Sequence, residues 1–186
     1  MKTQFYVLVA IGLCACMKPQ ITLADCWQSA PNAQNQLQFS VTHQQDVIQG
    51  TFTNFTVRFC QTDKNPQKLH VIVATASATT GNSLANAALA SDTFLAVKAY
   101  PQAEYAAGTF AAENTGFVAA GKLTLHGVTQ AMNVFFVVNK KADRLVLQGH
   151  AIVPRLAFNI GQDEWQTTKE LANEIRLEFK VMLKHQ

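Results

Sequence analysis

The sequence predicts an all-β domain, a closed antiparallel barrel of about eight strands with one short helical insertion. Most of the chain beyond residue 25 consists of segments in which apolar and polar residues alternate, as they do in half-buried strands. Residues 84–95 are rich in alanine and suit a short helix. Closure of a sheet removes its edges, and about eight strands can enclose one ligand, so a barrel is favoured and a β-sandwich is the alternative.

The first 24 residues predict export. Lys2 precedes an uncharged apolar run at residues 5–17, and small residues stand three and one positions before Asp25. This pattern is typical of a cleaved signal peptide, which assigns residues 1–24 to the peptide, residues 25–186 to one domain and the protein to the periplasm. The apolar run has about 13 residues, fewer than the roughly 20 that cross a bilayer, which disfavours a retained membrane helix.

A second processing route is open at residues 13–16. The sequence Leu-Cys-Ala-Cys resembles a lipoprotein processing box, although a cysteine just before the small residue is unusual. The alternative to a released periplasmic protein is therefore a lipoprotein anchored through Cys16.

The charge balance disfavours polyanionic partners. Removal of residues 1–24 deletes Lys2 and Lys18 and no acid, so 13 Lys and Arg remain of 15, against 12 Asp and Glu. The mature chain has a formal charge of only +1, and no cluster of Lys and Arg is evident along the sequence. Nucleic-acid binding is therefore not expected.

The first hairpin is predicted from residues 37–41 and 47–59, which reverse near Gln44 and Gln45. Phe52 shares a face with Ile48, but the apolar residues after Asn54 take the opposite parity. The phase therefore slips near Asn54, which indicates a bulge or bend of the kind that closes barrels.

Two cysteines follow the export segment, Cys26 and Cys60, and the predicted compartment is oxidising. Numbers of opposed residues in the first hairpin sum to about 89, which places Cys60 across from about position 29 and within reach of Cys26. A disulfide between them is predicted, and two free buried thiols are the alternative.

Further alternating segments predict the remaining strands, at residues 69–74, 103–110, 118–125, 132–138, 144–153 and 156–160. The alanine-rich segment at residues 84–95 predicts a short helix or a structured loop, interrupted at residues 91–93. The tail is ambiguous, because some of its apolar residues also fit a helical stripe. Strict alternation from Ile175 to Leu183 explains more of its residues, so a final strand is predicted.

Residues 121–129 predict the central turn of the domain. Leu123 and Leu125 point to one face of a strand, and Gly127 permits a tight reversal before the next apolar run.

No catalytic or metal-binding motif stands out. The five histidines are far apart and have no second ligand at helical or hairpin spacing, so no metal site and no cofactor are expected. The residues after Asp25 show no nucleophile elbow, phosphate loop or Cys-x-x-Cys motif. An enzyme is not expected.

Six groups of residues occur in an order seen in one known family: Leu37-Gln38-Phe39 with His43; Gly50-Thr51-Phe52; Ser77 with Thr80-Gly81; Tyr100-Pro101; residues 121–129; and Arg155 with Phe158, Ile160 and Gly161. They resemble the YceI-like family, whose members are periplasmic polyisoprenoid-binding proteins with a lipocalin-like barrel. The last group is similar to the version in members related to cytochrome b561 fusions. The resemblance covers nearly all of the mature chain.

The resemblance implies an amphipathic isoprenoid lipid, either a polyprenyl phosphate or an isoprenoid quinone, carried or sequestered inside the barrel. Twelve phenylalanines suit an apolar tunnel, although the same rings could fill an ordinary core. The predicted ligand-binding residues are Phe39, Phe52, Phe55, Val71, Phe94, Leu125, Phe136, Arg155 and Phe158.

Arg155 is the predicted head-group contact, because a guanidinium suits phosphate or a quinone oxygen. A structural ion pair at the barrel rim is its alternative role. Transient membrane contact and dimerisation are left open as further interactions. The alternative function is that of a stress-related periplasmic interaction protein without a stable ligand.

Overall fold

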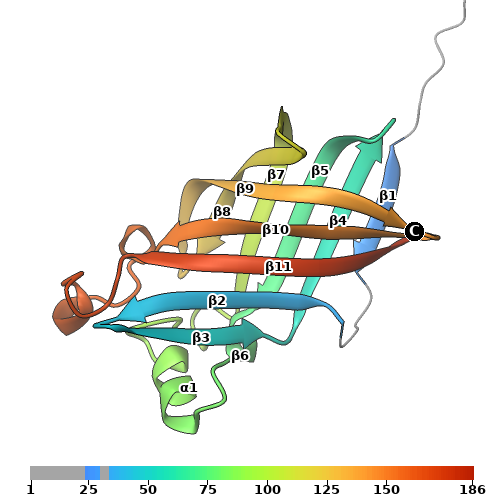
Figure 1. Ribbon diagram of the computed structural model, residues 1–186. Helices are drawn as coiled ribbons and strands as arrows, with labels where there is room; N and C mark the ends of the chain where they lie inside the picture. Colours follow the sequence, from blue (N-terminus) through green and yellow to red (C-terminus); the bar gives the residue numbers. More distant parts are fainter. Residues whose placement is uncertain (1–23, 30–33) are drawn as a thin grey trace, which may run out of the picture.

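The computed structural model describes residues 24–29 and 34–186 and confirms a closed antiparallel barrel (Figure 1). Eight strands form the ring in the order β1-β4-β5-β7-β8-β9-β10-β11, and β11 pairs back with β1. The strands are β1 (Asp25–Ser29), β2 (Gln36–His43), β3 (Asp46–Phe52), β4 (Phe55–Thr62), β5 (Asn65–Ala74), β6 (Ala78–Thr79), β7 (Gln102–Glu113), β8 (Gly116–Leu125), β9 (Val128–Lys141), β10 (Arg144–Pro154) and β11 (Glu174–His185). The helices are α1 (Ser83–Ala90) and the short 3-10 turns η1 (Thr75–Ser77), η2 (Arg155–Phe158) and η3 (Asp163–Trp165).

Three strands extend the sheet beyond the ring. β11 pairs with β1 near its C-terminal end and with β2 from Arg176 to Lys180, so β1 and β2 follow one another along the same edge. β3 and β6 continue outward from β2. The predicted export segment lies outside the described residues, except for Ala24.

β11 confirms the strand predicted for the tail. Val181 and Leu183 are buried inside the barrel, whereas Lys180 and Lys184 are exposed. Burial of the apolar face therefore overrides the helical stripe, which would have left Leu177 and Val181 off the buried face.

The central turn joins β8 to β9 through His126 and Gly127, which both have positive φ, 52° and 74°. A Cβ on Gly127 would lie 2.6 Å from the ring of Tyr100, so only glycine fits both the backbone and the space. His126 faces the Tyr100 ring at 5.0 Å, and its Nδ1 lies 3.2 Å from the carbonyl oxygen of Phe158. The turn is thereby fixed against neighbouring loops.

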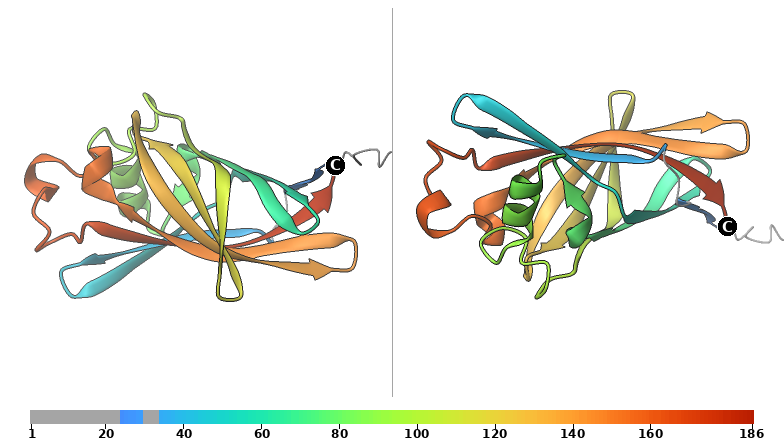
Figure 2. Two further views of the ribbon diagram at one scale, coloured as in Figure 1. Left: turned by 90° about the horizontal axis from the view of Figure 1, so that it is seen from above. Right: turned by 90° about the horizontal axis from the view of Figure 1, so that it is seen from below.

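Helix α1 occupies the first part of the predicted helical segment. The side chain of Asn82 caps it by accepting a hydrogen bond from the backbone N–H of Ala85 at 3.0 Å. The helix ends at Ser91, the predicted interruption. Both views of Figure 2 show α1 at the end of the barrel that lies opposite the C terminus.

The strand predicted at residues 156–160 is wrong. Residues 155–158 form the 3-10 turn η2, and Asn159 takes a left-handed conformation with φ 57°. The cause is local: Pro154 ends β10, and the backbone then curls so that several carbonyls meet the buried side chain of Arg155. Alternation of apolar residues over five positions did not distinguish this turn from a strand.

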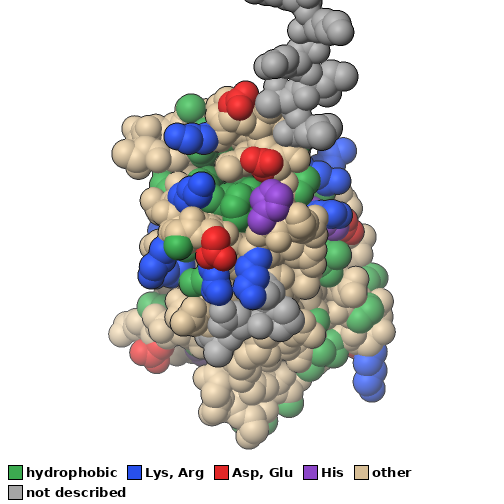
Figure 3. All heavy atoms as spheres, turned by 90° about the vertical axis from the view of Figure 1, so that its right-hand side faces the viewer, with side chains coloured by type: hydrophobic (Ala, Val, Ile, Leu, Met, Phe, Trp, Pro, Cys, Tyr) green, Lys and Arg blue, Asp and Glu red, His purple; other side chains and the backbone are tan. Residues whose placement is uncertain are grey.

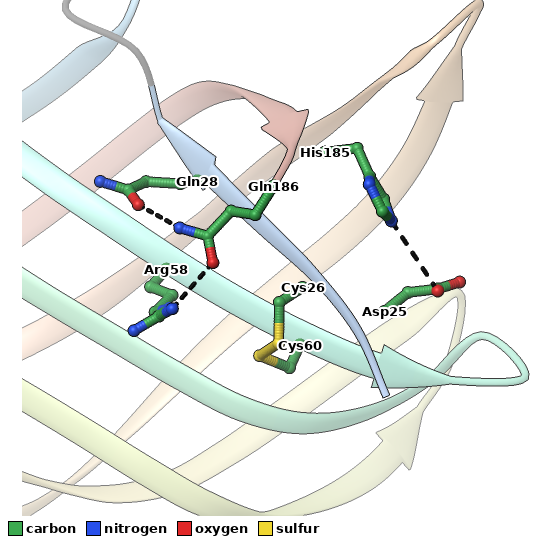
Figure 4. Close-up of a disulfide and its surroundings, with 7 residues drawn as sticks. All are labelled: Asp25, Cys26, Gln28, Arg58, Cys60, His185 and Gln186. Atoms are coloured by element: carbon green, nitrogen blue, oxygen red, sulfur yellow. Dashed lines mark hydrogen bonds and ion pairs between the residues drawn. A yellow bond between two sulfur atoms is a disulfide. The ribbon is translucent and has the colours of Figure 1, made fainter. Parts of the chain in front are cut away.

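The predicted disulfide between Cys26 and Cys60 is present (Figure 4). The predicted register is confirmed for β2 and β3, where the numbers of paired residues such as Gln38 and Thr51 sum to 89, but its extension to Cys60 is wrong. The chain bends at residues 53–54, where the phase slip was predicted, and thus divides the single strand predicted at residues 47–59 into β3 and β4. Cys60 therefore lies on β4, directly opposite Cys26 on β1, a strand that had not been predicted.

The disulfide lies where the C-terminal residues meet β1 and β4 (Figure 4). The side chain of Gln186 donates to Gln28 on β1 and accepts from Arg58 on β4 at 2.8 Å. His185 lies 3.8 Å from Asp25. In the chain-entropy description, a cross-link over 34 residues stabilises the fold by about 3 to 4 kcal/mol.

Candidate ligand-binding cavity

The barrel encloses an apolar cavity in two adjacent parts. The upper chamber, of about 320 Å³, lies towards α1, and the lower chamber, of about 100 Å³, lies deeper between the strands. The two chambers share five wall residues: Leu37, Val73, Ala103, Leu123 and Leu177. The inner faces of the strands therefore surround two adjacent apolar spaces rather than a solid core.

Four predicted residues line the upper chamber, together with Arg155: Phe39, Phe52, Phe94 and Leu125. The rings of Phe39 and Phe52 lie 5.4 Å apart and come from neighbouring strands. Gly50 is the cross-strand partner of Phe39, and a Cβ there would overlap the Phe39 ring. The glycine therefore makes room for this wall residue.

The upper chamber opens between the β2–β3 hairpin, α1 and η3. Its lining includes His43, the exposed residues Ile48 and Ala88, and Trp165. The Trp165 ring lies 5.9 Å from the His43 ring and 5.9 Å from the Phe94 ring. An amphipathic ligand could thus place its polar end beside an imidazole and an indole.

Three predicted residues line the lower chamber: Phe55, Val71 and Phe136. Phe136 is fully buried, and its ring lies 5.9 Å from Phe59, 6.3 Å from Phe110 and 5.9 Å from Phe117. Phe136 therefore serves both as the wall of the chamber and as the centre of an aromatic core cluster.

Tyr105 supplies a hydroxyl to the lower chamber, but that hydroxyl is already satisfied. It lies 2.9 Å from the carbonyl oxygen of Ala119 and 3.2 Å from that of Met132, and can donate to either. Burial raises the pKa of Tyr105 to about 12, because the phenolate would be poorly solvated inside the barrel. The deep end of the cavity therefore favours neutral, apolar groups.

The raised pKa of Tyr105 predicts a loss of stability at high pH. The unfolded chain releases this proton near pH 10, whereas the folded state keeps it to about pH 12. The free energy of unfolding should therefore fall between these values, by up to about 2 to 3 kcal/mol. Urea unfolding over this range measures the fall, and Tyr105→Phe should show a correspondingly weaker pH dependence. Equal slopes for the two proteins would contradict the assignment.

Arg155 is buried, with 1% of its surface exposed, and all five of its N–H donors meet backbone carbonyls. Nε donates to Ala172 at 3.0 Å, Nη1 to Ile160 at 2.9 Å and Gly161 at 3.0 Å, and Nη2 to Trp165 at 2.6 Å and Leu171 at 2.8 Å. Burial lowers the pKa of Arg155 from its ordinary value. The guanidinium has no donor left for a head group and holds together the loops between β10 and β11.

Phe158, the last predicted binding residue, is buried but lines neither chamber. The sequence reasoning also left out wall residues of both chambers, such as Val41, His43, Val73, Ala103, Trp165 and Leu177. Most of these occupy the alternate strand positions that point into the barrel, so extending the alternation along each strand would have found them. Trp165 lies in a 3-10 turn, for which alternation gives no signal.

Ionisable groups are scarce on the cavity walls. Among the described residues that line the upper chamber, only His43 and Arg155 can carry a charge. Within residues 24–29 and 34–186, no three His, Cys, Asp or Glu side chains come together in a group that could hold a metal ion. No helix in this part of the chain has the length and apolar character needed to span a membrane.

A closed eight-stranded barrel around an apolar cavity defines a class of proteins whose interior is wide enough to hold one small ligand. Within that class, residues 27–183 match the model of the YceI-like domain, and the chain belongs to the YceI-like family. UPF0312 proteins of Yersinia pestis (strain Pestoides F) and Yersinia enterocolitica are each 32% identical over 89 residues, which is 47% of this chain. The chain spans 46% of the length of these curated relatives.

Solved structures share the fold. BcnA from Burkholderia cenocepacia superposes with a TM-score of 0.78 at 22% identity, over 83% of this chain and 98% of BcnA. A polyisoprenoid-binding domain from Saccharophagus degradans, implicated in plant cell wall breakdown, gives a TM-score of 0.66 at 13% identity, over 88% of this chain and 100% of that domain. The YceI protein of Campylobacter jejuni gives 0.64 at 21% identity, over 75% and 85%.

Proposed function

We propose that the protein binds an isoprenoid lipid with an uncharged head group, such as a quinone or a prenol, and carries or sequesters it after export. The observation that carries this proposal is the cavity itself, whose walls are almost entirely apolar from the mouth to Phe136. Each CH₂ of a tail buried there contributes about 0.8 kcal/mol. The polyisoprenoid-binding domain of Saccharophagus degradans, which has the same fold, supports an isoprenoid as the ligand.

The state of Arg155 supports a neutral head group over the phosphate that the family resemblance also allowed. A phosphate drawn into the mouth would lose hydration and would need a free cation or several free donors in exchange. All five donors of Arg155 bind carbonyls, and His43 is the other ionisable residue among the described residues that line the upper chamber. A quinone or hydroxyl oxygen needs only one donor, which His43 can supply.

The described walls also support binding rather than catalysis. They bring together no nucleophile with a base and no pair of carboxylates, since their ionisable members are His43 and Arg155 in the upper chamber and Tyr105 in the lower chamber. We therefore place the protein among binding proteins rather than enzymes. The alternative of an interaction protein without a stable ligand predicts no saturable binding in the titration below.

Trp165 provides an intrinsic probe of this proposal. The protein has two tryptophans, and only Trp165 lines the cavity mouth, whereas Trp27 lies on β1 beside His185. A short-chain isoprenoid quinone should quench Trp165 fluorescence saturably, and the Trp165→Phe variant should lose this signal.

A competition titration then compares head groups on one tail length. The prenol should compete with the quinone with an affinity at least about tenfold higher than that of the matching prenyl phosphate. The phosphate would lose its hydration in the cavity without gaining a free cation as partner. Tighter displacement by the phosphate would overturn the assignment of a neutral head group. Absence of any saturable quenching or displacement would overturn ligand binding altogether.

A further inference from the structure

The two ends of the barrel differ in charge, although the chain from Asp25 is nearly neutral overall. The end opposite the cavity mouth is built from the turns at residues 63–64, 114–115 and 142–143 together with Asp25 and the C terminus. Figure 3 views this end and shows Lys and Arg side chains gathered on it. The Lys and Arg residues on these turns and strand ends are Arg58, Lys64, Lys68, Lys140, Lys141, Arg144 and Lys184.

Four acids share this end with those seven cations, namely Asp25, Asp63, Glu113 and Asp143, so its formal charge is +3. The remainder of the chain from Asp25 has six Lys and Arg against eight acids, a formal charge of −2. The segments around the cavity mouth contribute most of these acids, including Asp46, Asp163, Glu164 and Glu170. The barrel is therefore polarised along its length.

We propose that this basic end docks on the surface of an anionic phospholipid membrane and holds the cavity mouth away from it. The cations are exposed or half-buried and are spread over separate turns, and none of them lines either chamber of the cavity. A broad, shallow charged surface suits a layer of lipid head groups better than one small anion. Each Lys or Arg near such a surface strengthens binding about fivefold, so three net charges give on the order of 100-fold.

The position of β1 supports a membrane as the occupant. β1 begins at Asp25 on the basic end, so residues 1–24 join the barrel there, with their apolar run and Cys16. If Cys16 is lipidated, only eight residues separate it from Asp25, and they reach at most about 28 Å. An acyl chain and a basic surface would then act on the same side, which is the combination that gives stable anchoring.

This orientation has a consequence for lipid exchange. β11 has 12 residues and spans roughly 40 Å. Because barrel strands tilt by roughly 35 to 45° from the axis, the mouth would face away from the membrane at a height of about 30 Å. The ligand would pass to or from a partner or a second membrane, and not through the surface on which the protein rests. The docking itself depends only on the charges and not on the proposed ligand.

Vesicle sedimentation tests the docking with the chain that starts at Asp25, which contains all eleven strands and the disulfide. It should bind phosphatidylethanolamine vesicles that contain about one quarter phosphatidylglycerol, and about 0.5 M salt should abolish this binding. Vesicles with phosphatidylcholine in place of phosphatidylglycerol should bind at least about 30-fold more weakly.

Two triple variants, each with three Lys→Glu changes and therefore with equal net charge, test whether the basic end is the docking surface. Lys140→Glu, Lys141→Glu and Lys184→Glu change the basic end, and should lower vesicle binding about 100-fold or more. Lys98→Glu, Lys122→Glu and Lys169→Glu change exposed residues elsewhere, and should lower it less than about fivefold. Quinone quenching of Trp165 is measured for both triples and should be unchanged.

Equal losses in the two triples would overturn the docking, since net charge alone would then explain the binding. Tighter binding to a single-stranded DNA oligomer than to the vesicles would assign the basic end to a different polyanion and would also overturn it. Loss of vesicle binding with unchanged quinone quenching separates this proposal from the proposed function.

Discussion

Replacing Arg155 with leucine should destabilise the protein by about 4 kcal/mol or more. The leucine would leave five backbone carbonyls without their donor, and the carbonyls of Ile160, Gly161 and Leu171 meet it in buried positions. Each unmet buried carbonyl costs about 1 to 3 kcal/mol, and a broken buried charge network typically costs about 3 to 5 kcal/mol in total. Urea unfolding of the variant and the parent protein measures this difference.

Two matched variants test the explanation. Arg155→Lys keeps the charge but offers three donors without the planar fork, so it should recover only part of the stability. Arg176→Leu removes an exposed arginine from β11 and should change the stability by less than about 0.5 kcal/mol. If Arg155→Leu cost less than about 1 kcal/mol and instead selectively weakened binding of a prenyl phosphate, the guanidinium would be a ligand contact and not a structural one.

Ala103→Phe should lower isoprenoid affinity about 100-fold or more, which corresponds to about 2.7 kcal/mol. Ala103 lies on β7 and lines both chambers, so a phenyl ring there would fill space where the two chambers lie side by side. The fold should lose little stability, because the ring enters an existing cavity rather than a packed core. Competition titration gives the affinity, and thermal unfolding gives the stability.

Ala106→Phe is the control for that variant. Ala106 lies on the same strand but faces outward and is exposed, so the same ring should leave affinity unchanged. Phe136→Asn would test the deep wall less cleanly, because Phe136 also centres the contacts with Phe59, Phe110 and Phe117. A loss of stability in Ala103→Phe with full ligand affinity would show that the ligand does not occupy this cavity.

Alternation of apolar residues predicted the barrel well, because the inner face of each strand must be apolar along its whole length. It located the tail strand and the bend near Asn54 for the same reason. It missed β1, a strand of only five residues in which Cys26 and Trp27 interrupt any clear alternation. Without β1, the sequence could not predict that β11 closes the barrel against β1, or that Cys26 and Cys60 lie opposite each other on β1 and β4.

The candidate site was predicted less evenly. Phe39, Phe52 and Leu125 share the inward parity of their strands, and parity alone placed them near a common interior. Arg155 shows the limit of this approach, since a guanidinium suits a phosphate and a set of carbonyls equally well. Its carbonyl partners come from the irregular chain after β10, whose path has no periodic signal in the sequence.

Native mass spectrometry of the purified protein, followed by organic extraction, tests ligand binding most directly. We expect one neutral isoprenoid for each chain, released on extraction, with a mass that identifies a quinone or prenol. The Ala103→Phe protein, purified in the same way, should carry none, and Ala106→Phe should carry the same lipid. A parent protein that carries no lipid and takes up no added isoprenoid would contradict the account.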